Sequence, residues 1–186
     1  MAGTLAIRRA GALVRAGGVV AYPTEAVWGL GCDPLDANAV ARILAIKQRP
    51  ASMGLILIAA DVAQLAPWIE PLTADLEARV TATWPGPVTW ILPAQPWVPD
   101  WVHGGRGSIA VRVTAHAQSA ALCRATGFAI VSTSANRSGK PPARTGIQVR
   151  RWFGDEVDLI LDGATGGRDR PSEIRDAVSG RRIRAA

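Results

Sequence analysis

Cysteine and histidine are both scarce in this chain of 186 residues, which contains two of each. Cys32 and Cys123 lie far apart and lack the Cys-x-x-Cys spacing of structural zinc sites, while His103 and His116 add no pattern of metal ligands. We therefore expect two buried free thiols and no metal site formed by the protein. The sequence also lacks the HExxH and GxGxxG motifs and the residue order of a catalytic serine triad.

Long apolar runs are missing as well. The longest, Leu55–Ala60, has the length of a strand and is far shorter than the roughly 18 residues that a membrane-spanning helix requires. At the N-terminus, Arg8 and Arg9 follow a short apolar stretch, which is the reverse of the order in a secretory signal peptide. The sequence therefore predicts a soluble, cytoplasmic protein without a membrane segment.

Lysine is rare although the chain is basic. The formal net charge is +6, and Lys47 and Lys140 are the only lysines among 21 basic residues. A basic balance favours a polyanionic partner such as a nucleotide, an RNA or an acidic surface, but it does not choose among them. A composition bias of the genome is one explanation of the arginine excess. Against that background the two lysines stand out, because both lie in or beside the motifs described below.

The length suits one domain spanning residues 1–186. The content of 48% hydrophobic and 19% charged residues is ordinary for a globular protein. Apolar periodicity and capping residues predict helices over Leu5–Ala16, Asn38–Lys47, Asp61–Leu65, Thr73–Thr83, His116–Thr126 and Gly146–Phe153. Short apolar runs predict strands over Val19–Tyr22, Leu55–Ala59, Val88–Leu92, Ile109–Val113, Ala129–Ser132 and Val157–Leu161, with one or two more within Glu173–Arg184. This irregular alternation predicts an α/β fold with a twisted mixed sheet and flanking helices.

The segment Tyr22–Gly31 combines a proline, a hydroxyl, a carboxylate and two glycines directly after a predicted strand. Polar side chains at the carboxyl end of a strand face the usual ligand crevice of an α/β sheet, and glycines let the backbone approach a ligand closely. A Pro-Thr turn with glycines at sharp bends explains the same residues equally well. Both interpretations stay open on the residues alone.

Two cations, Lys47 and Arg49, alternate just after a predicted helix. They could clamp a phosphate or a carboxylate, the lysine as a point charge and the arginine as a fork. Cations near a helix C-terminus are also routine, because they interact favourably with the helix dipole. On its own, this pair favours the structural interpretation.

Two further polar segments follow later in the chain. Ser132–Gly139 places five hydroxyl or amide side chains after a buried strand, which favours a loop that cradles an anion over a plain polar turn. Pro171–Asp176 precedes Arg181, Arg182 and Arg184, which could reach a phosphate. The residues alone favour a solvated tail there.

Together, in this order, the segments resemble the YrdC-like family of threonylcarbamoyl-AMP synthases in its short, single-domain form. Each motif is weak alone, but six in order and at family spacing are specific, and the Lys47-x-Arg49 pair and Ser134-Ala-Asn136 are characteristic of the family. The matching segments are Tyr22-Pro-Thr-Glu with Trp28-Gly-Leu-Gly-Cys-Asp33, Lys47-x-Arg49, Trp84-Pro-Gly-Pro-Val-Thr89, Ser108-Ile-Ala-Val-Arg-Val113, Ser132-Thr-Ser-Ala-Asn136 and Pro171-Ser-Glu-Ile-Arg-Asp176.

The resemblance implies a single-domain α/β fold around a deep, basic cavity that binds ATP and L-threonine side by side, with bicarbonate and, usually, Mg²⁺ accompanying the ATP. The products would be threonylcarbamoyl-AMP and pyrophosphate. Partner proteins would then transfer the threonylcarbamoyl group to the adenosine beside the anticodon of tRNAs that read ANN codons. A direct contact of this chain with tRNA or double-stranded RNA is compatible with its charge.

The resemblance also assigns roles to residues. Thr24, Arg112, Ser132 and Ser172 would bind threonine, with Arg112 pairing with the threonine carboxylate as a fork. Lys47 and Arg49 would be the catalytic pair that neutralises the ATP phosphates and the departing pyrophosphate. The residues that would hold the nucleotide are Lys47, Arg49, Ser108, Ser134, Asn136 and Arg184. We assign no nucleophile, because positioning and charge stabilisation carry such chemistry.

Two positions and one segment depart from the family pattern. Trp28 replaces a common tyrosine or phenylalanine, and Pro142 stands where many long-form members carry a nucleotide-binding serine. The segment Ala51–Leu55 differs from its polar counterpart in the long form, which changes the expected surroundings of the threonine side chain.

Two other functions compete with this prediction. A binding module with a basic cavity could hold structured RNA without catalysis, and its affinity would then fall steeply with salt. The fold resemblance extends to the carbamoyl-transfer proteins of hydrogenase maturation, which use carbamoyl phosphate. Those proteins are much larger and carry acylphosphatase and zinc-finger segments, and this chain has neither the length nor the cysteines for them.

Overall fold

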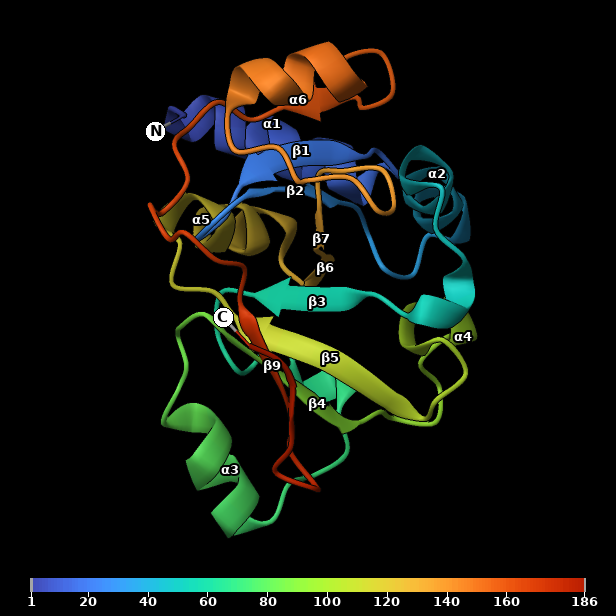
Figure 1. Cartoon of the computed structure of the whole chain (residues 1–186), viewed down its shortest axis with the longest axis vertical. Coiled ribbons are helices and arrows are strands. Elements are labelled where there is room, and N and C mark those ends of the chain that lie inside the picture. The colour runs from blue at the N-terminus through green and yellow to red at the C-terminus, as the bar shows by residue number, and fades with distance from the viewer. Residues whose placement is uncertain (1, 186) are drawn as a thin grey trace.

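The computed structural model describes residues 2–185 and contains two mixed sheets with helices around them (Figure 1). The smaller sheet has the strand order β7-β2-β1-β8, in which β1 is antiparallel to β2 and parallel to β8. Its strands are β1 (Val20–Pro23), β2 (Trp28–Gly31), β7 (Thr133–Ser134) and β8 (Leu159–Ile160). β1 is buried on both faces, as its unbroken apolar sequence predicts.

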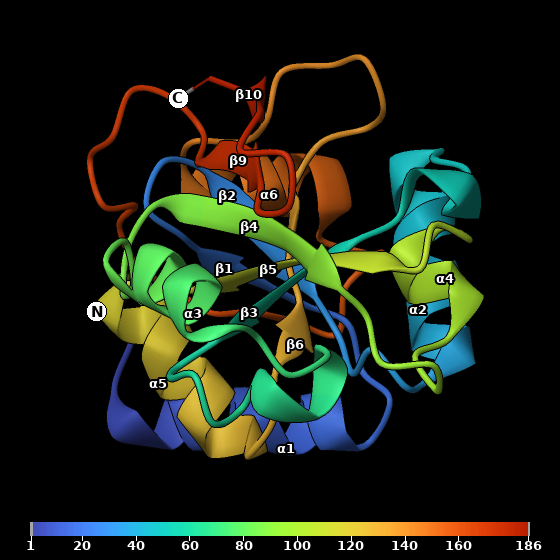
Figure 2. The ribbon, with the colours of Figure 1, turned by 90° about the horizontal axis from the view of Figure 1, so that it is seen from below.

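The larger sheet has six strands in the order β10-β9-β4-β5-β3-β6 (Figure 2). Within it β5 is parallel to β3 and antiparallel to β4, and β4 is parallel to β9. Its strands are β3 (Ile56–Ala59), β4 (Val88–Pro93), β5 (Ser108–Val113), β6 (Ile130–Val131), β9 (Glu173–Asp176) and β10 (Arg182–Arg184). The C-terminal segment therefore completes this sheet, and Ser172 directly precedes its strand β9.

Helices cover the two sheets. They are α1 (Thr4–Arg15), α2 (Ala37–Lys47), α3 (Ala74–Thr81), α4 (Asp100–His103), α5 (Ala117–Thr126) and α6 (Gly146–Phe153), with 3₁₀ turns η1 (Ala51–Met53) and η2 (Ala66–Trp68). α1 and α6 lie at one end of the molecule and α3 at the other (Figure 1). α1 packs so closely on α5 that a Cβ on Gly11 would lie 2.8 Å from the Cβ of Ala125, so this helix contact requires glycine.

One hydrophobic core extends across both sheets. Trp28 and Leu30 of the smaller sheet and Leu57 and Leu92 of the larger one are almost fully buried in it. A second cluster lies under α1 and α5 and includes Tyr22, whose hydroxyl donates to the carbonyl of Val131 at 3.3 Å. This close packing holds the strands of both sheets in place, and with them the ends of the loops that connect the strands.

Helix α2 ends next to the candidate site, and its two ends are specified locally. The Asp36 side chain accepts hydrogen bonds from the backbone N–H groups of Asn38 and Ala39, at 2.9 and 3.0 Å, and so caps the first turn. At the other end Gln48 adopts a left-handed conformation with φ 51°. The chain therefore reverses immediately after Lys47, and Arg49 points to a different part of the molecule.

The predicted α/β class and mixed-sheet architecture are confirmed, and the strands divide between two sheets. The predicted helix over Asp61–Leu65 is wrong. The Asp61 side chain accepts from the backbone N–H of Gln64 and the Gln64 side chain accepts from that of Ala60, so local side-chain bonds replace a helical ladder there. Strand β2 and helix α4 were missed, since we expected turns at Trp28–Gly31 and a loop before Gly107.

The other predicted helices and strands are present, with shorter ends for several of them. Both cysteines are free and buried, as predicted. Within residues 2–185, no helix is both long enough and apolar enough to cross a membrane.

Candidate functional site

A cavity of about 570 Å³ lies between the two sheets and receives residues from both of them. Its walls come from the β1–β2 turn, β4, β5, the β6–β7 connection and the C-terminal segment. Eight of the ten predicted site residues line it: Thr24, Arg49, Ser108, Arg112, Ser132, Ser134, Ser172 and Arg184. These residues are far apart in sequence, so the fold assembles them into one site.

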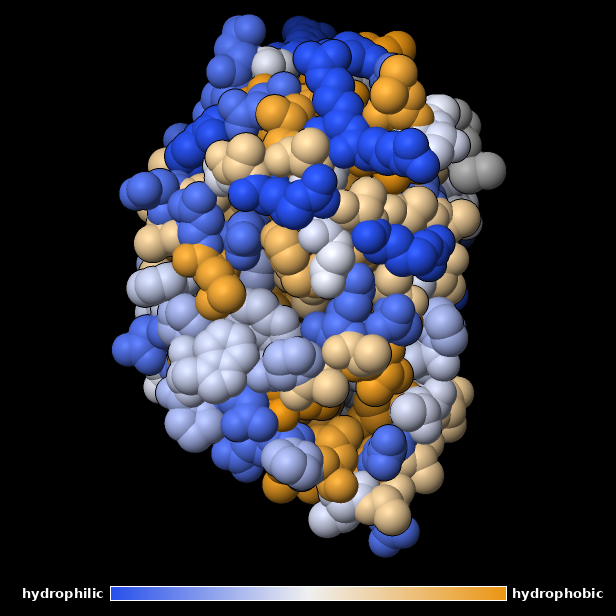
Figure 3. All heavy atoms as spheres, turned by 180° about the vertical axis from the view of Figure 1, so that it is seen from behind, coloured by the Kyte–Doolittle hydropathy of each residue, from blue (hydrophilic) through white to orange (hydrophobic). Residues whose placement is uncertain are grey.

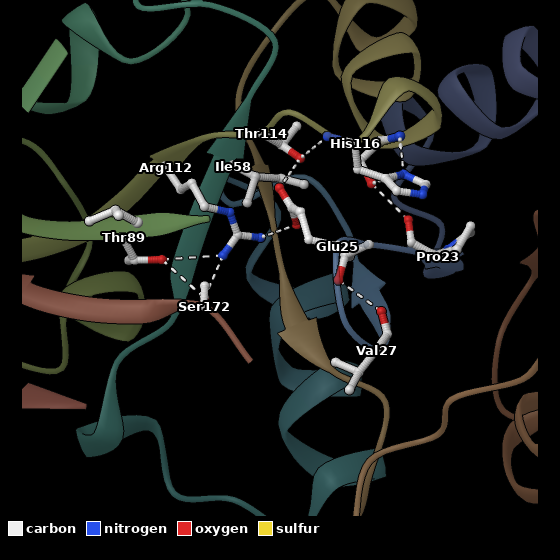
Figure 4. A network of polar contacts seen from close by, with 12 residues as sticks. Pro23, Glu25, Val27, Ile58, Thr89, Arg112, Thr114, His116 and Ser172 are labelled. Atoms are coloured by element: carbon white, nitrogen blue, oxygen red, sulfur yellow. Dashed lines mark hydrogen bonds and ion pairs between the residues drawn. The ribbon is translucent and has the colours of Figure 1, made fainter. Parts of the chain in front are cut away.

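Arg112 of β5 is the centre of a polar network on one side of the cavity (Figure 4). Its Nη1 donates to the hydroxyls of Ser172 and Thr89 at 2.8 and 3.2 Å. Its Nη2 lies 3.4 Å from Oε2 of Glu25. The guanidinium is buried, and these contacts hold it in one orientation inside the cavity.

Glu25 completes this network and was not predicted from the sequence. Its Oε1 accepts a hydrogen bond from Thr114 Oγ1 at 2.7 Å (Figure 4). Burial disfavours its ionised form, but Arg112 and the Thr114 hydroxyl outweigh burial and hold the pKa of Glu25 below its ordinary value. The carboxylate is therefore charged at neutral pH. Its place in the motif after Thr24 was visible in the sequence, but its pairing with Arg112 was not.

Thr24 and Ser132 both lie close to Gly29 of β2. Thr24 Oγ1 donates to the carbonyl of Val27 at 2.8 Å, and this bond closes the turn between β1 and β2. A Cβ on Gly29 would lie 3.3 Å from the Thr24 methyl and 3.6 Å from Ser132 Oγ. Glycine at this position therefore keeps the two hydroxyl-bearing residues close together on the cavity wall.

Ser172 joins the C-terminal segment to the same network. Arg184 Nη2 donates to the backbone carbonyl of Ser172 at 2.7 Å, while Arg112 donates to its hydroxyl. Burial, together with the charge of Arg112, lowers the pKa of Arg184. The predicted threonine contact Ser172 and the predicted nucleotide contact Arg184 are thus direct neighbours.

Lys47 and Asn136 are the two predicted site residues that do not line the cavity, within the part of the chain that the structure describes. Lys47 is only 2% exposed, and its Nζ donates to the backbone carbonyls of Ser134 and Asn136 and to Asn136 Oδ1. Ser134 Oγ donates to the same Oδ1 at 2.6 Å. Lys47 therefore supports the Ser134–Asn136 loop from behind, and Ser134 presents that loop to the cavity.

This buried lysine has a perturbed ionisation. Burial, and secondarily the charge of Arg49, lowers the pKa of Lys47 to about 8. The oxygens of the loop take up its three N–H donors. The charge thus lies immediately behind the cavity wall.

A second cluster of cations lies at the η1 turn. Arg49 Nη2 donates to the carbonyl of Gly54 at 3.0 Å, and Arg106 Nη2 donates to the carbonyl of Ser52 at 2.8 Å. Burial and the nearby charge of Arg106 lower the pKa of Arg49. Arg106 also lines the cavity, and it was not predicted from the sequence because Arg106-Gly107 matches no nucleotide fingerprint.

These two groups of residues suit a ligand with two differently charged parts. The Arg112 network offers hydroxyls, one carboxylate and a guanidinium, while Arg49, Arg106 and Ser134 offer cations and a polar loop to an anion. Pro142 lines the wall as well, so that position contributes no hydroxyl. No group of histidine, cysteine, aspartate and glutamate side chains in residues 2–185 could hold a metal ion.

The chain matches one family model over most of its length. The Sua5/YciO/YrdC family model, whose description reads "Telomere recombination", matches residues 12–186. The chain is 57% identical over 178 residues to a threonylcarbamoyl-AMP synthase of Halorhodospira halophila, which covers 96% of this chain and 93% of that protein.

Solved structures show the same fold. P. abyssi Sua5 complexed with L-threonine has a TM-score of 0.88 and 36% identity, over 94% of this chain and 51% of that one. HypF of T. kodakarensis has a TM-score of 0.78 at 21% identity, over 95% of this chain and 23% of that one, so it shares the fold alone. The family model covers nearly the whole chain and the bacterial relative is more than half identical to it, so the chain belongs to the Sua5/YciO/YrdC family.

Proposed function

We propose that this protein is a threonylcarbamoyl-AMP synthase, which converts L-threonine, bicarbonate and ATP into threonylcarbamoyl-AMP and pyrophosphate. The main support for the proposal is that a single cavity is lined by Arg112, Ser132 and Ser172 and also by Arg49 and Ser134. The names of close relatives point to the same reaction. We also propose that the product serves tRNA modification, through partner proteins that transfer the threonylcarbamoyl group to tRNAs reading ANN codons.

The threonine half of the reaction is assigned to the Arg112 network. Arg112 would pair with the threonine carboxylate, and Thr24, Ser132 and Ser172 would bind the rest of the amino acid. A fixed guanidinium is suited to this role, because the hydrogen bonds that it donates to Thr89, Ser172 and Glu25 leave it little freedom to reorganise on binding.

The ATP half is assigned to residues from both parts of the cavity, including Arg184, which lies beside Ser172. Ser108, Ser134 and Arg184 would contact the nucleotide from the cavity wall, and Asn136 would act through the Ser134 hydroxyl that it binds. Arg49 would neutralise the phosphates directly. Lys47 would add its charge from behind the Ser134–Asn136 loop, whose carbonyls it binds.

The bond changes explain why no nucleophilic side chain is needed. The threonine ammonium loses a proton to solvent, and the resulting amine becomes a carbamate by adding the carbon of bicarbonate and losing water. A carbamate oxygen then attacks the α-phosphorus of ATP, and the bond from that phosphorus to the pyrophosphate oxygen breaks. The protein's residues orient the two substrates, exclude water from the unstable carbamate and stabilise the charge that develops on the departing pyrophosphate.

We propose that Mg²⁺ enters with ATP and is held by phosphate oxygens and water. The only carboxylate among the described residues that line the cavity is Glu25, and Arg112 and Thr114 already bind it. The donors present therefore do not form a carboxylate cage for the ion.

The alternative of an RNA-binding module is not favoured, because eight predicted site residues line one cavity and close relatives carry the name threonylcarbamoyl-AMP synthase. A tRNA contact in addition to catalysis stays a proposal, as does the cytoplasmic location. Exposed arginines of α1 and α6 are suited to such a contact, and hydrophilic side chains are abundant at that end of the molecule (Figure 3). These arginines are Arg8, Arg9, Arg15, Arg150 and Arg151.

Pyrophosphate release by the purified protein tests the proposal. The reaction would contain ATP, Mg²⁺, bicarbonate and L-threonine, and each would be omitted in turn. Release that requires both threonine and bicarbonate supports a synthase. Folded protein that binds RNA and releases no pyrophosphate under any of these conditions would overturn it in favour of the binding module.

A further inference from the structure

The cavity contains a single acidic side chain within the described part of the chain, that of Glu25. Every other charged side chain on its walls is basic: Arg49, Arg106, Arg112 and Arg184. A free amino acid carries both an anion and a cation. Four guanidinium groups attract its carboxylate and repel its ammonium, so the ammonium has one favourable place in this cavity, beside Glu25.

The backbone around Glu25 is held firmly. The N–H of Gly166 donates to the carbonyl of Thr24 at 3.0 Å, and the N–H of Arg168 donates to the carbonyl of Glu25 at 3.1 Å. A Cβ on Gly166 would lie 2.9 Å from the Glu25 carbonyl oxygen, so this close packing of the 166–168 segment requires glycine. The carboxylate is thus presented from a fixed turn and is only 8% exposed.

Glu25 also retains capacity for another hydrogen bond. Its Oε1 is engaged by Thr114 at 2.7 Å, whereas its Oε2 lies 3.4 Å from Arg112 Nη2, which is longer than a good charge-assisted bond. A carboxylate offers about four acceptor positions, and the described contacts use two of them. A ligand can therefore bind Glu25 without displacing Arg112.

We propose that Glu25 binds the ammonium group of the amino-acid substrate, so that Glu25 and Arg112 together recognise the two charges of one zwitterion. The inference rests on the proposed function, because it takes L-threonine as the ligand. The two side chains are close neighbours, as are the ammonium and carboxylate groups of an α-amino acid, which share one carbon. Glu25 accordingly selects amino acids over hydroxy acids of the same shape.

Two ligands separate this role from a purely structural one. L-Threonine carries both charges, whereas (R)-3-hydroxybutyrate retains the carboxylate and the hydroxyl and lacks the ammonium. Calorimetric titration of the full chain with each ligand gives a ratio of affinities. The wild type should bind L-threonine at least about tenfold more tightly than the hydroxy acid, as one charge-assisted hydrogen bond predicts.

The variant Glu25→Gln should weaken L-threonine about tenfold or more and leave 3-hydroxybutyrate unchanged or slightly tighter, so that the ratio approaches one. If Glu25 only held Arg112 in place, both ligands would weaken by the same factor and the ratio would persist, which would overturn the inference. ATP binding and thermal unfolding of the variant check its fold. The wild-type ratio is an independent test, since equal binding of both ligands contradicts the inference whatever the variant does.

The outcomes also separate this inference from the proposed function. Threonine-dependent pyrophosphate release by the wild type, together with an unchanged affinity ratio in Glu25→Gln, would refute the role of Glu25 and leave the synthase intact. Absence of both threonine binding and pyrophosphate release in the wild type would refute both.

Discussion

The ammonium of Lys47 donates to the backbone carbonyl and to the side-chain oxygen of Asn136, each at 3.0 Å. The last residue of α2 therefore fixes a loop that lies almost 90 residues further along the chain. Ser134, in the same loop, faces the cavity. The two elements characteristic of the family thus form one unit, in which the lysine orders the loop that meets the nucleotide under the proposed function.

Replacing this lysine should reduce both stability and activity. Lys47→Ala leaves partly buried oxygens of Ser134 and Asn136 without their donor, so the free energy of unfolding should fall by about 1–3 kcal/mol. Pyrophosphate release should fall about a hundredfold, because the Ser134–Asn136 loop loses its support and the phosphates lose a nearby charge. Urea denaturation and a coupled pyrophosphate assay measure the two effects.

The other lysine offers a matched control. Lys140 is exposed, and Lys140→Ala should change neither quantity appreciably. Equal effects of the two substitutions would show that the position of Lys47 has no special importance.

The pH dependence of stability should reveal the buried Lys47. Its pKa is about 8 in the folded protein, below the ordinary 10.5. The unfolded state therefore binds more protons between these two values, and the free energy of unfolding should rise with pH there, by at most about 1.4 kcal/mol per unit from this group. Denaturation of the wild type and of Lys47→Met across that range measures the difference, which should be absent if the lysine titrates normally.

Arg112 should be required for both threonine binding and stability. Arg112→Ala leaves the Glu25 carboxylate buried without its cation, which should cost about 3–5 kcal/mol of unfolding free energy. The KM for threonine should rise about tenfold or more, while the KM for ATP changes little.

Arg112→Lys provides the comparison, since it retains the charge and loses the planar fork. It should recover much of the stability and little of the threonine affinity. Full recovery of both by lysine would contradict a fork-like contact with the threonine carboxylate.

Arg106 should contribute to nucleotide binding although it was not predicted as a site residue. It lies beside Arg49 at the η1 turn and lines the cavity. Arg106→Ala should raise the KM for ATP about three- to tenfold with little change in that for threonine. Arg151→Ala, which removes an exposed arginine of α6, is the matched control. Equal effects of both variants would indicate a general dependence on net charge.

The sequence predicted those parts of the fold that depend on local chemistry. Helix α2 ends at Lys47 as predicted, with Asp36 as its cap, and the predicted helix over Gly146–Phe153 has the same bounds in the structure. Strand β2 was missed because Gly29 and Gly31 read as turn residues. Within this strand a Cβ on Gly31 would lie 2.8 Å from the Tyr22 ring, and a Cβ on Gly29 would be in tight contact with Thr24 at 3.3 Å, so glycine is suited to both positions.

The site required contacts that no local pattern contains. Resemblance to the family identified eight residues that line the cavity, but the pairing of Glu25 with Arg112 joins positions 87 residues apart. The orientation of Lys47 away from the cavity likewise depends on the Ser134–Asn136 loop, which is far from Lys47 in sequence. Both facts follow from the packing of two sheets, which periodicity cannot predict.

The most direct test of the central claim is the fate of the carbon of bicarbonate. Protein incubated with ATP, Mg²⁺, L-threonine and ¹³C-bicarbonate would be quenched rapidly and analysed by mass spectrometry. The account predicts threonylcarbamoyl-AMP that carries the ¹³C label, in an amount that matches the pyrophosphate released. Pyrophosphate accompanied only by AMP or threonyl-AMP, with no labelled carbamoyl product, would contradict it.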